Sequence, residues 1–352
     1  MYIMCGEVKT VEFNSAFEYE ILNPGLAPIY ILNRGNIRGW IEERAADGAR
    51  PNTRAVKGYQ RLSKTAGDYQ TAMKVNAAVI TDNFWVKDSD AIAYEDVLFH
   101  KNEYWRLALM RDISDLPKMP SRTPELSNIG SEEKGWRLDK DGWWLYKNQR
   151  INENLSEYIT SRIGEALGFN MAKYYLEDKG SLIRTKDFTA GKYNLQHIDC
   201  IMTDHYEDGE AVPDDDYLYN YKTLMAISKD LAEQYINICI CDAVCENFDR
   251  HTKNYGLLTD RQTGEIISLA PNYDNNNSLY ANRGLDADRN SGVIRYFAEF
   301  VSQNNIPLIV PELYIGDLED IIDEAYSSSQ YEFDREFVNR FIANGINRLR
   351  QL

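Results

Sequence analysis

The stretch Cys245–Gly256 reads CENFDRHTKNYG, and it decides how the rest of the chain is interpreted. It places Asp249 five residues before Asn254, and a second string, APNYD, ends at Asp274, twenty residues after that asparagine. Phosphoryl transfer from ATP requires one carboxylate that orients an acceptor hydroxyl, and a carboxamide and a further carboxylate that hold magnesium. Asp249, Asn254 and Asp274 fit these three roles in that order.

The segments around this stretch separate the catalytic interpretation from a simpler one. An aspartate and an asparagine at this spacing are, by themselves, more often turn residues of a solvated loop. Here, however, Tyr255–Thr259 and Glu265–Leu269 are predicted as strands, and Thr263-Gly264 marks the turn between them. A hairpin of this kind would bring Asp274 back beside Asn254.

The string DRHxxN and the string Pro271–Asp274 resemble the catalytic loop and the metal-binding aspartate of the HipA-like serine/threonine kinases, the toxin kinases of bacterial toxin–antitoxin systems. Phosphoinositide kinases also carry DRHxxN, but their metal aspartate lies in an IDFG-like string that this chain lacks. The resemblance covers residues 121–352. It implies transfer of the γ-phosphate of ATP, with Mg²⁺, to a serine or threonine of a protein substrate.

Three residues upstream take nucleotide-binding roles from this resemblance. The polar segment 127–136 matches the phosphate-covering loop, in which Lys134 would meet the ATP phosphates. Lys147 ends an aromatic strand and corresponds to the ATP lysine, a point charge for the phosphates. Glu157 lies on the predicted helix that follows and would position this lysine, with Glu153 as the competing candidate.

The resemblance also assigns a hinge and a regulatory serine. Lys186 and Phe188 fall where main-chain groups of the hinge would contact adenine, and Ser131 falls in the phosphate loop. Ser127 matches the serine that is autophosphorylated in the family, with Ser131 as the alternative. A phosphate there would repel the phosphates of ATP, so we expect modification to move the loop out of the site and switch the enzyme off.

Two further side chains of the catalytic loop are grouped with Asp249. Arg250 and His251 are expected to brace the loop rather than to react. His251 as the general base is the alternative, although an aspartate can accept the proton late in a loose transition state.

Composition places the chain among globular, cytoplasmic proteins. Its 352 residues are 43% hydrophobic and carry a net charge of -16. That charge argues against direct nucleic-acid binding and against anionic membranes. The first nine residues lack the features of a signal peptide, and no apolar run is long enough to span a bilayer. The five cysteines form no CxxC motif and are expected to be buried thiols rather than zinc ligands or disulfides.

The predicted fold class is α+β, a two-lobed protein-kinase-like fold with an additional N-terminal region. Residues 1–120 form that region, whose role the sequence does not reveal, and short strands are expected at 30–32 and 78–81. Residues 121–190 would form the strand-rich N-lobe, with the phosphate loop and the ATP lysine. Residues 191–352 would form the helical C-lobe, with the catalytic loop.

Two other functions compete with the protein kinase. A phosphoinositide-type lipid kinase is disfavoured by the missing IDFG string and by the acidic charge. A catalytically weak pseudokinase that acts as a binding module is disfavoured by the intact set of candidate residues. The expected partners are a protein substrate and, from the resemblance, an antitoxin.

Overall fold

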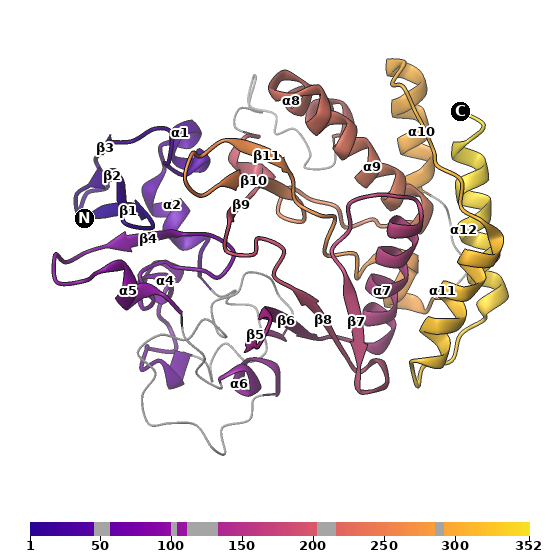
Figure 1. The fold of residues 1–352 in the computed structure, drawn as a ribbon, viewed down its shortest axis with the longest axis horizontal. Helices are drawn as coiled ribbons and strands as arrows, with labels where there is room; N and C mark the ends of the chain where they lie inside the picture. Colours follow the sequence, from indigo (N-terminus) through magenta and orange to yellow (C-terminus); the bar gives the residue numbers. More distant parts are fainter. Residues whose placement is uncertain (46–56, 100–103, 111–132, 203–215, 286–291) are drawn as a thin grey trace. The chain divides into compact units, whose positions relative to one another are not determined.

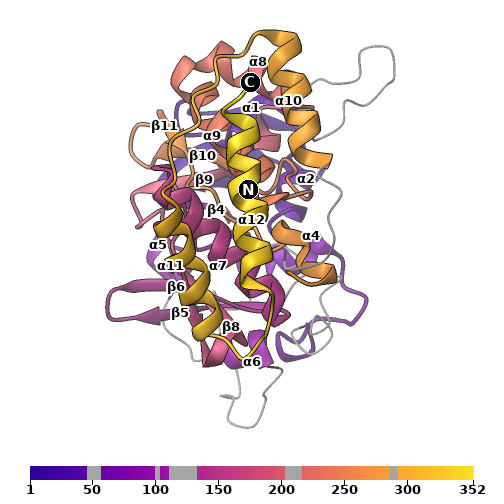
Figure 2. The same cartoon turned by 90° about the vertical axis from the view of Figure 1, so that its right-hand side faces the viewer.

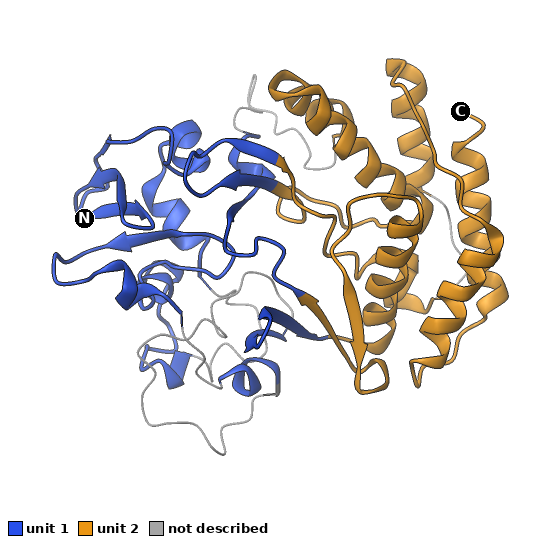
Figure 3. Ribbon diagram, in the orientation of Figure 1, with its two compact units in different colours: residues 1–148, 186–203, 257–267 blue, residues 149–185, 204–256, 268–352 orange. Residues whose placement is uncertain are grey.

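The computed structural model describes residues 1–45, 57–99, 104–110, 133–202, 216–285 and 292–352. These residues divide into two compact units, coloured separately in Figure 3. Unit 1 comprises residues 1–148, 186–203 and 257–267, and unit 2 comprises residues 149–185, 204–256 and 268–352. Antiparallel strands dominate unit 1 and helices dominate unit 2 (Figure 1), so the predicted α+β class is confirmed.

The N-terminal part of unit 1 is built on a four-stranded antiparallel sheet in the order β3-β2-β1-β4. The elements of this part are β1 (Tyr2–Cys5), β2 (Val8–Phe13), β3 (Tyr19–Ile21), α1 (Ile29–Arg34), α2 (Ile37–Glu42), α4 (Asp68–Met73), β4 (Phe84–Lys87), α5 (Tyr94–Val97) and α6 (Trp105–Met110). Both faces of this sheet are covered near its centre, since consecutive residues are buried in β1 (Ile3, Met4 and Cys5) and in β2 (Thr10 and Val11).

Two strand predictions in this part are wrong. Residues 30–32 belong to helix α1, which ends at Gly35 in the left-handed conformation. Residues 78–81 form turns, because Asn76 and Ala77 just before them both have positive φ angles and interrupt any extended strand. Their apolar, β-branched composition is equally compatible with buried helix or turn, and tertiary packing decides between them.

The rest of unit 1 contains the strands on which nucleotide-binding residues were predicted. Strands β5 (Glu133–Asp139) and β6 (Gly142–Asn148) form an antiparallel hairpin, in which Trp144 and Tyr146 of β6 pack on Leu109 of α6. A second sheet has the order β11-β10-β9, and its strands are β9 (Tyr193–His197), β10 (Gly256–Asp260) and β11 (Ile266–Leu269). The predicted hairpin after the catalytic loop is thereby confirmed, with Gly264 at its turn.

Unit 2 is organised around a buried central helix, α9 (Lys229–Cys245), as expected from its apolar sequence. The remaining elements are α7 (Ile151–Ala166), β7 (Tyr174–Glu177), β8 (Leu182–Lys186), α8 (Tyr217–Ile227), α10 (Gly292–Asn304), α11 (Ile315–Ser327) and α12 (Arg335–Leu349). Helices α8, α10 and α12 pack on α9, and α11 packs on both α7 and α12 (Figure 2). Gly345 of α12 allows this close approach, because a side chain there would press on the backbone of Val244.

The cysteines behave as predicted. All five are free and buried: Cys5 and Cys200 in unit 1, and Cys239, Cys241 and Cys245 in α9. Within the described ranges, the structure contains no helix with the length and apolar character needed to span a bilayer.

Candidate active site

The predicted catalytic loop follows directly from the C-terminus of α9. Glu246 ends the helix with a φ of 53°, a left-handed conformation that turns the chain away from the helix axis. The side chain of Asn247 then accepts a hydrogen bond from the backbone N–H of Asp249 at 3.2 Å. The side chain of Asn254 donates to the carbonyl oxygen of Asp249 at 2.8 Å. The backbone of Asp249 is therefore held from both sides.

Arg250 joins this loop to the loop that carries Asp274. Its guanidinium makes a two-bond ion pair with Asp242 of α9, at 2.9 and 2.8 Å, and the two side chains are 10% and 4% exposed. One nitrogen, Nη1, donates both to the carbonyl of Asn254 at 2.7 Å and to the carbonyl of Tyr273 at 2.9 Å. The carbonyl of Asn254 and the carbonyl of Tyr273, which directly precedes Asp274, therefore accept from the same nitrogen. This places Asn254 and Asp274 close together, as predicted.

The electrostatics of Arg250 suit this structural role. Burial disfavours its charge, but the neighbouring carboxylate of Asp242 outweighs burial and raises the pKa of the guanidinium above its usual value. The other terminal nitrogen, Nη2, also donates to the side-chain oxygens of Asn272 and Asn275, at 2.9 and 2.6 Å. Arg250 stays charged and holds five groups at once, which is the bracing role expected from the sequence.

His251 also contributes to the shape of the loop. Its Nδ1 accepts a hydrogen bond from the backbone N–H of Lys253 at 3.2 Å. That nitrogen is thereby engaged inside the loop itself.

Asp274 occupies an unusual backbone conformation. Its φ is 61°, in the left-handed region that non-glycine residues seldom adopt. Its backbone N–H lies 3.4 Å from the hydroxyl of Tyr174. Just upstream, Ala270 donates to the carbonyl of Gly256 at 2.7 Å and closes the base of the hairpin. Strained backbone of this kind is concentrated at functional sites, where the surrounding structure enforces it.

The carboxylate of Asp249 has a partner that the sequence analysis missed. Asn277 donates its side-chain N–H to Oδ2 of Asp249 at 2.8 Å. Asn277 follows two further asparagines, Asn275 and Asn276, in a run directly after Asp274. In the sequence, this role is indicated only by the run of three asparagines beside a candidate metal ligand.

The donor chemistry at Asn254 and Asp274 fits a magnesium ion. Asn254 is buried and uses its side-chain N–H for Asp249, so its carboxamide oxygen is the atom left to face a metal. Asp274 supplies a carboxylate, and magnesium prefers oxygen ligands of both kinds. These two residues lie in unit 2 together with Asp249.

The two lysines predicted to meet phosphates lie in unit 1. Lys134 of β5 and Lys147 of β6 are direct partners in the antiparallel ladder, so their side chains leave the same face of the hairpin. Lys147 is only 4% exposed. Both lysines therefore lie on one hairpin, as their predicted roles at the ATP phosphates would require.

The two candidate glutamates on α7 differ in what they do. The helix begins at Ile151, and Glu153 caps it by accepting from the backbone N–H of Arg150 at 3.0 Å. Glu157 is fully buried one turn later and accepts from the side chain of Gln149 at 3.3 Å. Glu153 is also in an ion pair with Arg150, so it is tied to the start of the helix.

The remaining predicted residues are distributed as follows. Lys186 pairs with Asp141 at 2.9 Å on the exposed side of unit 1. The backbone N–H of Asp187 is bonded to the carbonyl of Trp143, and Phe188 follows in a bend. Ser127 and Ser131 lie outside the described residues.

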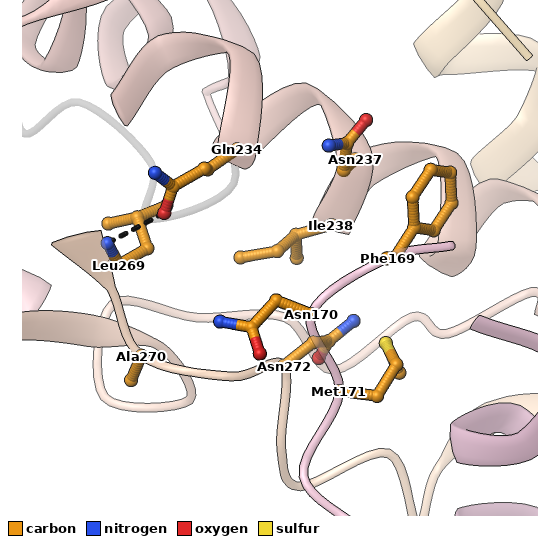
Figure 4. Close-up of a pocket in the computed structure, with 9 residues that line it drawn as sticks. All are labelled: Phe169, Asn170, Met171, Gln234, Asn237, Ile238, Leu269, Ala270 and Asn272. Atoms are coloured by element: carbon orange, nitrogen blue, oxygen red, sulfur yellow. Dashed lines mark hydrogen bonds between the residues drawn. The ribbon is translucent and has the colours of Figure 1, made fainter. Parts of the chain in front are cut away.

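A small cavity lies next to the Asp274 loop in unit 2 (Figure 4). It measures about 30 Å³ and is bordered by Asn170, Asn272 and Gln234 of α9, whose side chain accepts from Leu269 at 2.8 Å. Binding pockets for drug-sized ligands are on the order of 300–1,000 Å³, so this space is too small for a nucleotide. No described group accepts from the buried Nδ2 of Asn272, and the cavity has room for a water molecule that could do so.

Comparison with known proteins identifies the family. The HipA-like C-terminal domain matches residues 119–324, which is more than half of the chain. The protein therefore belongs to the HipA-like family, as the DRHxxN and Pro271–Asp274 strings predicted.

Two solved structures are similar to the chain at low sequence identity. The Shewanella oneidensis MR-1 toxin–antitoxin protein HipA, in its complex with HipB and operator DNA, is 14% identical with a TM-score of 0.46, over 99% of this chain and 95% of that one. The Helicobacter pylori proinflammatory kinase CtkA is 17% identical with a TM-score of 0.43, over 62% of this chain and 90% of that one. Among curated proteins, none matches the sequence.

Proposed function

We propose that the protein transfers the γ-phosphate of ATP to a serine or threonine hydroxyl of a protein substrate. The observation that carries the proposal is the convergence on Arg250, which joins the Asp249 loop and the Asp274 loop. This convergence supports Asp249 and the two oxygen ligands, Asn254 and Asp274, as parts of one site. Membership in the HipA-like family supports the same chemistry.

In this proposal each residue has a defined task. The carboxylate of Asp249 orients the acceptor hydroxyl and takes its proton while that oxygen bonds to the γ-phosphorus and the bond to ADP breaks. Magnesium, held by Asn254 and Asp274, would neutralise charge on the phosphates. Lys134 and Lys147 attract the phosphates, and Glu157 orients Lys147. The hinge role of Lys186 and Phe188 and the phosphate-loop roles of Ser131 and Ser127 belong to the same proposal.

The proposed partners are a protein substrate and an antitoxin. The antitoxin would be comparable to HipB, with which the Shewanella HipA is in complex. A pseudokinase would keep the fold without the transfer step. The presence of Asp249, Asn254, Asp274 and Lys147 together favours an active enzyme over that alternative.

The Asp249→Asn variant tests the proposal. We expect phosphoryl transfer from labelled ATP to fall by about 10²–10⁴-fold while ATP binding persists, because the carboxylate acts on the hydroxyl rather than on the nucleotide. The measurement is the transfer of labelled γ-phosphate by purified protein, with identification of modified residues by mass spectrometry. Wild-type turnover in the variant would remove the assignment of Asp249, and absence of transfer by the wild type would favour the pseudokinase.

A further inference from the structure

Side chains of the asparagine run after Asp274 link the carboxylate of Asp249 to the carboxylate of Glu157 through hydrogen bonds. Nδ2 of Asn277 donates to Oδ2 of Asp249 at 2.8 Å and lies 3.4 Å from Oδ1 of Asn276. Nδ2 of Asn276 donates to the side-chain oxygen of Gln149 at 2.8 Å. The nitrogen of Gln149 in turn lies 3.3 Å from Oε2 of Glu157. A chain of carboxamides therefore runs from the catalytic loop to helix α7, and all of its members belong to unit 2.

The hydrogen bonds of this series require carboxamide side chains rather than carboxylic acids. An ionised carboxylate can only accept hydrogen bonds, whereas a carboxamide both donates and accepts. Asp249 and Glu157 are the two ends, and each receives an N–H from its carboxamide neighbour. An aspartate at position 277 would instead bring a second negative charge against Asp249.

Because these carboxamides are buried, the hydrogen-bonded series is sensitive to the loss of any one of its side chains. Asn276 is 9% exposed, Gln149 is 8% exposed and Glu157 is fully buried. Removing one partner of a buried hydrogen bond leaves the other without its bond and without water to replace it. Buried networks of this kind also act as a unit, so an effect at one end is transmitted to the other.

We propose that Asn277, Asn276 and Gln149 are positioning residues that couple the orientation of Asp249 to that of Glu157. The kinetic part of this inference rests on the proposed function. Gln149 lies two residues after Lys147 in the sequence. Through this relay, the orientation of Glu157 depends on the orientation of Asp249. Glu157 would orient the ATP lysine, and Asp249 would orient the acceptor hydroxyl.

The kinetic test uses Asn277→Ala, Gln149→Ala and the double variant. Each single change should lower kcat by about 10-fold or more, the cost of a lost hydrogen bond to a charged group. Asn277→Ala, which acts beside the hydroxyl-orienting aspartate, should change KM for ATP little. The double variant should lose no more than the worse single variant, because both changes interrupt one chain. Asn277→Asp, which keeps the size of the side chain, should lose at least as much as Asn277→Ala. The matched control is Asn347→Ala, an exposed asparagine of α12, which should keep the wild-type kcat.

A second readout is independent of activity. The same single and double variants are unfolded in urea without nucleotide, and their midpoints are compared with those of the wild type and of Asn347→Ala. Losses smaller in the double variant than the sum of the single losses support the relay, and additive losses overturn it. Additive kinetic effects, or an unchanged kcat in Asn277→Ala, also overturn it while leaving the proposed function intact. If the wild type transfers no phosphate, the proposed function fails, and the urea experiment still decides whether the residues are coupled.

Discussion

Among the described residues, each unit contains a buried arginine–aspartate pair held by two hydrogen bonds. Arg44 uses its two terminal nitrogens, whereas Arg250 uses Nε and Nη2. In unit 1, Arg44 bonds both oxygens of Asp82, at 2.8 and 2.6 Å, with side chains 9% and 4% exposed. In unit 2, Arg250 bonds both oxygens of Asp242, at 2.9 and 2.8 Å, with side chains 10% and 4% exposed. Two-bond pairs of this kind are the strong and geometrically specific form of the interaction.

The pairs differ in what else the arginine holds. Arg44 also donates to the carbonyls of Ala77 and Phe84, and so fixes the turn that leads into β4. Arg250 donates to the carbonyls of Asn254 and Tyr273, and so fixes two loops that carry candidate active-site residues. The same kind of ion pair thus holds a structural turn in unit 1 and the candidate active-site loops in unit 2. The two arginines differ in which backbone carbonyls accept their remaining hydrogen bonds.

The largest expected effect is that of Arg250→Ala. Removing the arginine leaves Asp242 buried without its counter-charge, which costs about 3–5 kcal/mol in the free energy of unfolding. Both loops also lose their common anchor, and a displacement of about 1 Å in a catalytic group can cost about 10²-fold in rate. We therefore expect losses in both urea denaturation and phosphoryl transfer. A variant that keeps wild-type transfer would show that Arg250 does not organise the site.

Arg44→Ala is expected to affect stability alone. It leaves Asp82 buried without its counter-charge, so the free energy of unfolding should again fall by about 3–5 kcal/mol. Below the unfolding transition, phosphoryl transfer per folded molecule should remain at the wild-type value, because Arg44 contacts none of the candidate active-site residues. Transfer rates are measured at a temperature where circular dichroism shows the variant to be folded. A loss of transfer comparable to that of Arg250→Ala would erase the contrast between the two pairs.

The smallest effect is expected in the labelling of thiols, which reports where each variant opens. Burial raises the pKa of the Cys5 thiol to about 11, and it also raises the pKa values of Cys200 and Cys239, so thiolate is scarce at pH 8 and labelling of the wild type should be slow. In Arg44→Ala, the two cysteines of unit 1 should react before those of α9. In Arg250→Ala, the order should reverse. Mass spectrometry of alkylated peptides gives the order, and equal rates for all thiols would mean that the units open together.

The local structure of the candidate catalytic loop could be predicted from sequence because its residues are close together in the chain. Asp249 and Asn254, five positions apart, are joined by a hydrogen bond. The turn at Gly264 indicates the hairpin that brings the Asp274 segment back toward Asn254. The strand of Lys147 and the helix of Glu157 were predicted for a similar reason, since each is a local periodic pattern. The HipA-like family was likewise legible from the two short strings.

The N-terminal region could not be predicted in the same way. The sequence analysis did not anticipate strands β1, β2 and β3, and it assigned helix α1 as a strand. These segments are short, and their apolar residues satisfy helix and strand patterns equally well. Tertiary pairing decides between the patterns: β1 pairs with β4, which lies more than seventy residues away in the sequence, and β2 and β3 are added to this pair in turn.

The sequence alone determined which chemical groups are available: a carboxylate, a carboxamide and a second carboxylate in the order needed for phosphoryl transfer, and a helix whose apolar residues bury it. Tertiary structure alone decided which distant groups meet. Asn277 reaches Asp249, and Gln149 reaches both Asn276 and Glu157, across separations in the chain of up to 127 positions. The physical reason is that a side-chain hydrogen bond depends on a contact of about 3 Å in space, and spacing in the chain encodes such contacts only within one turn, helix or hairpin.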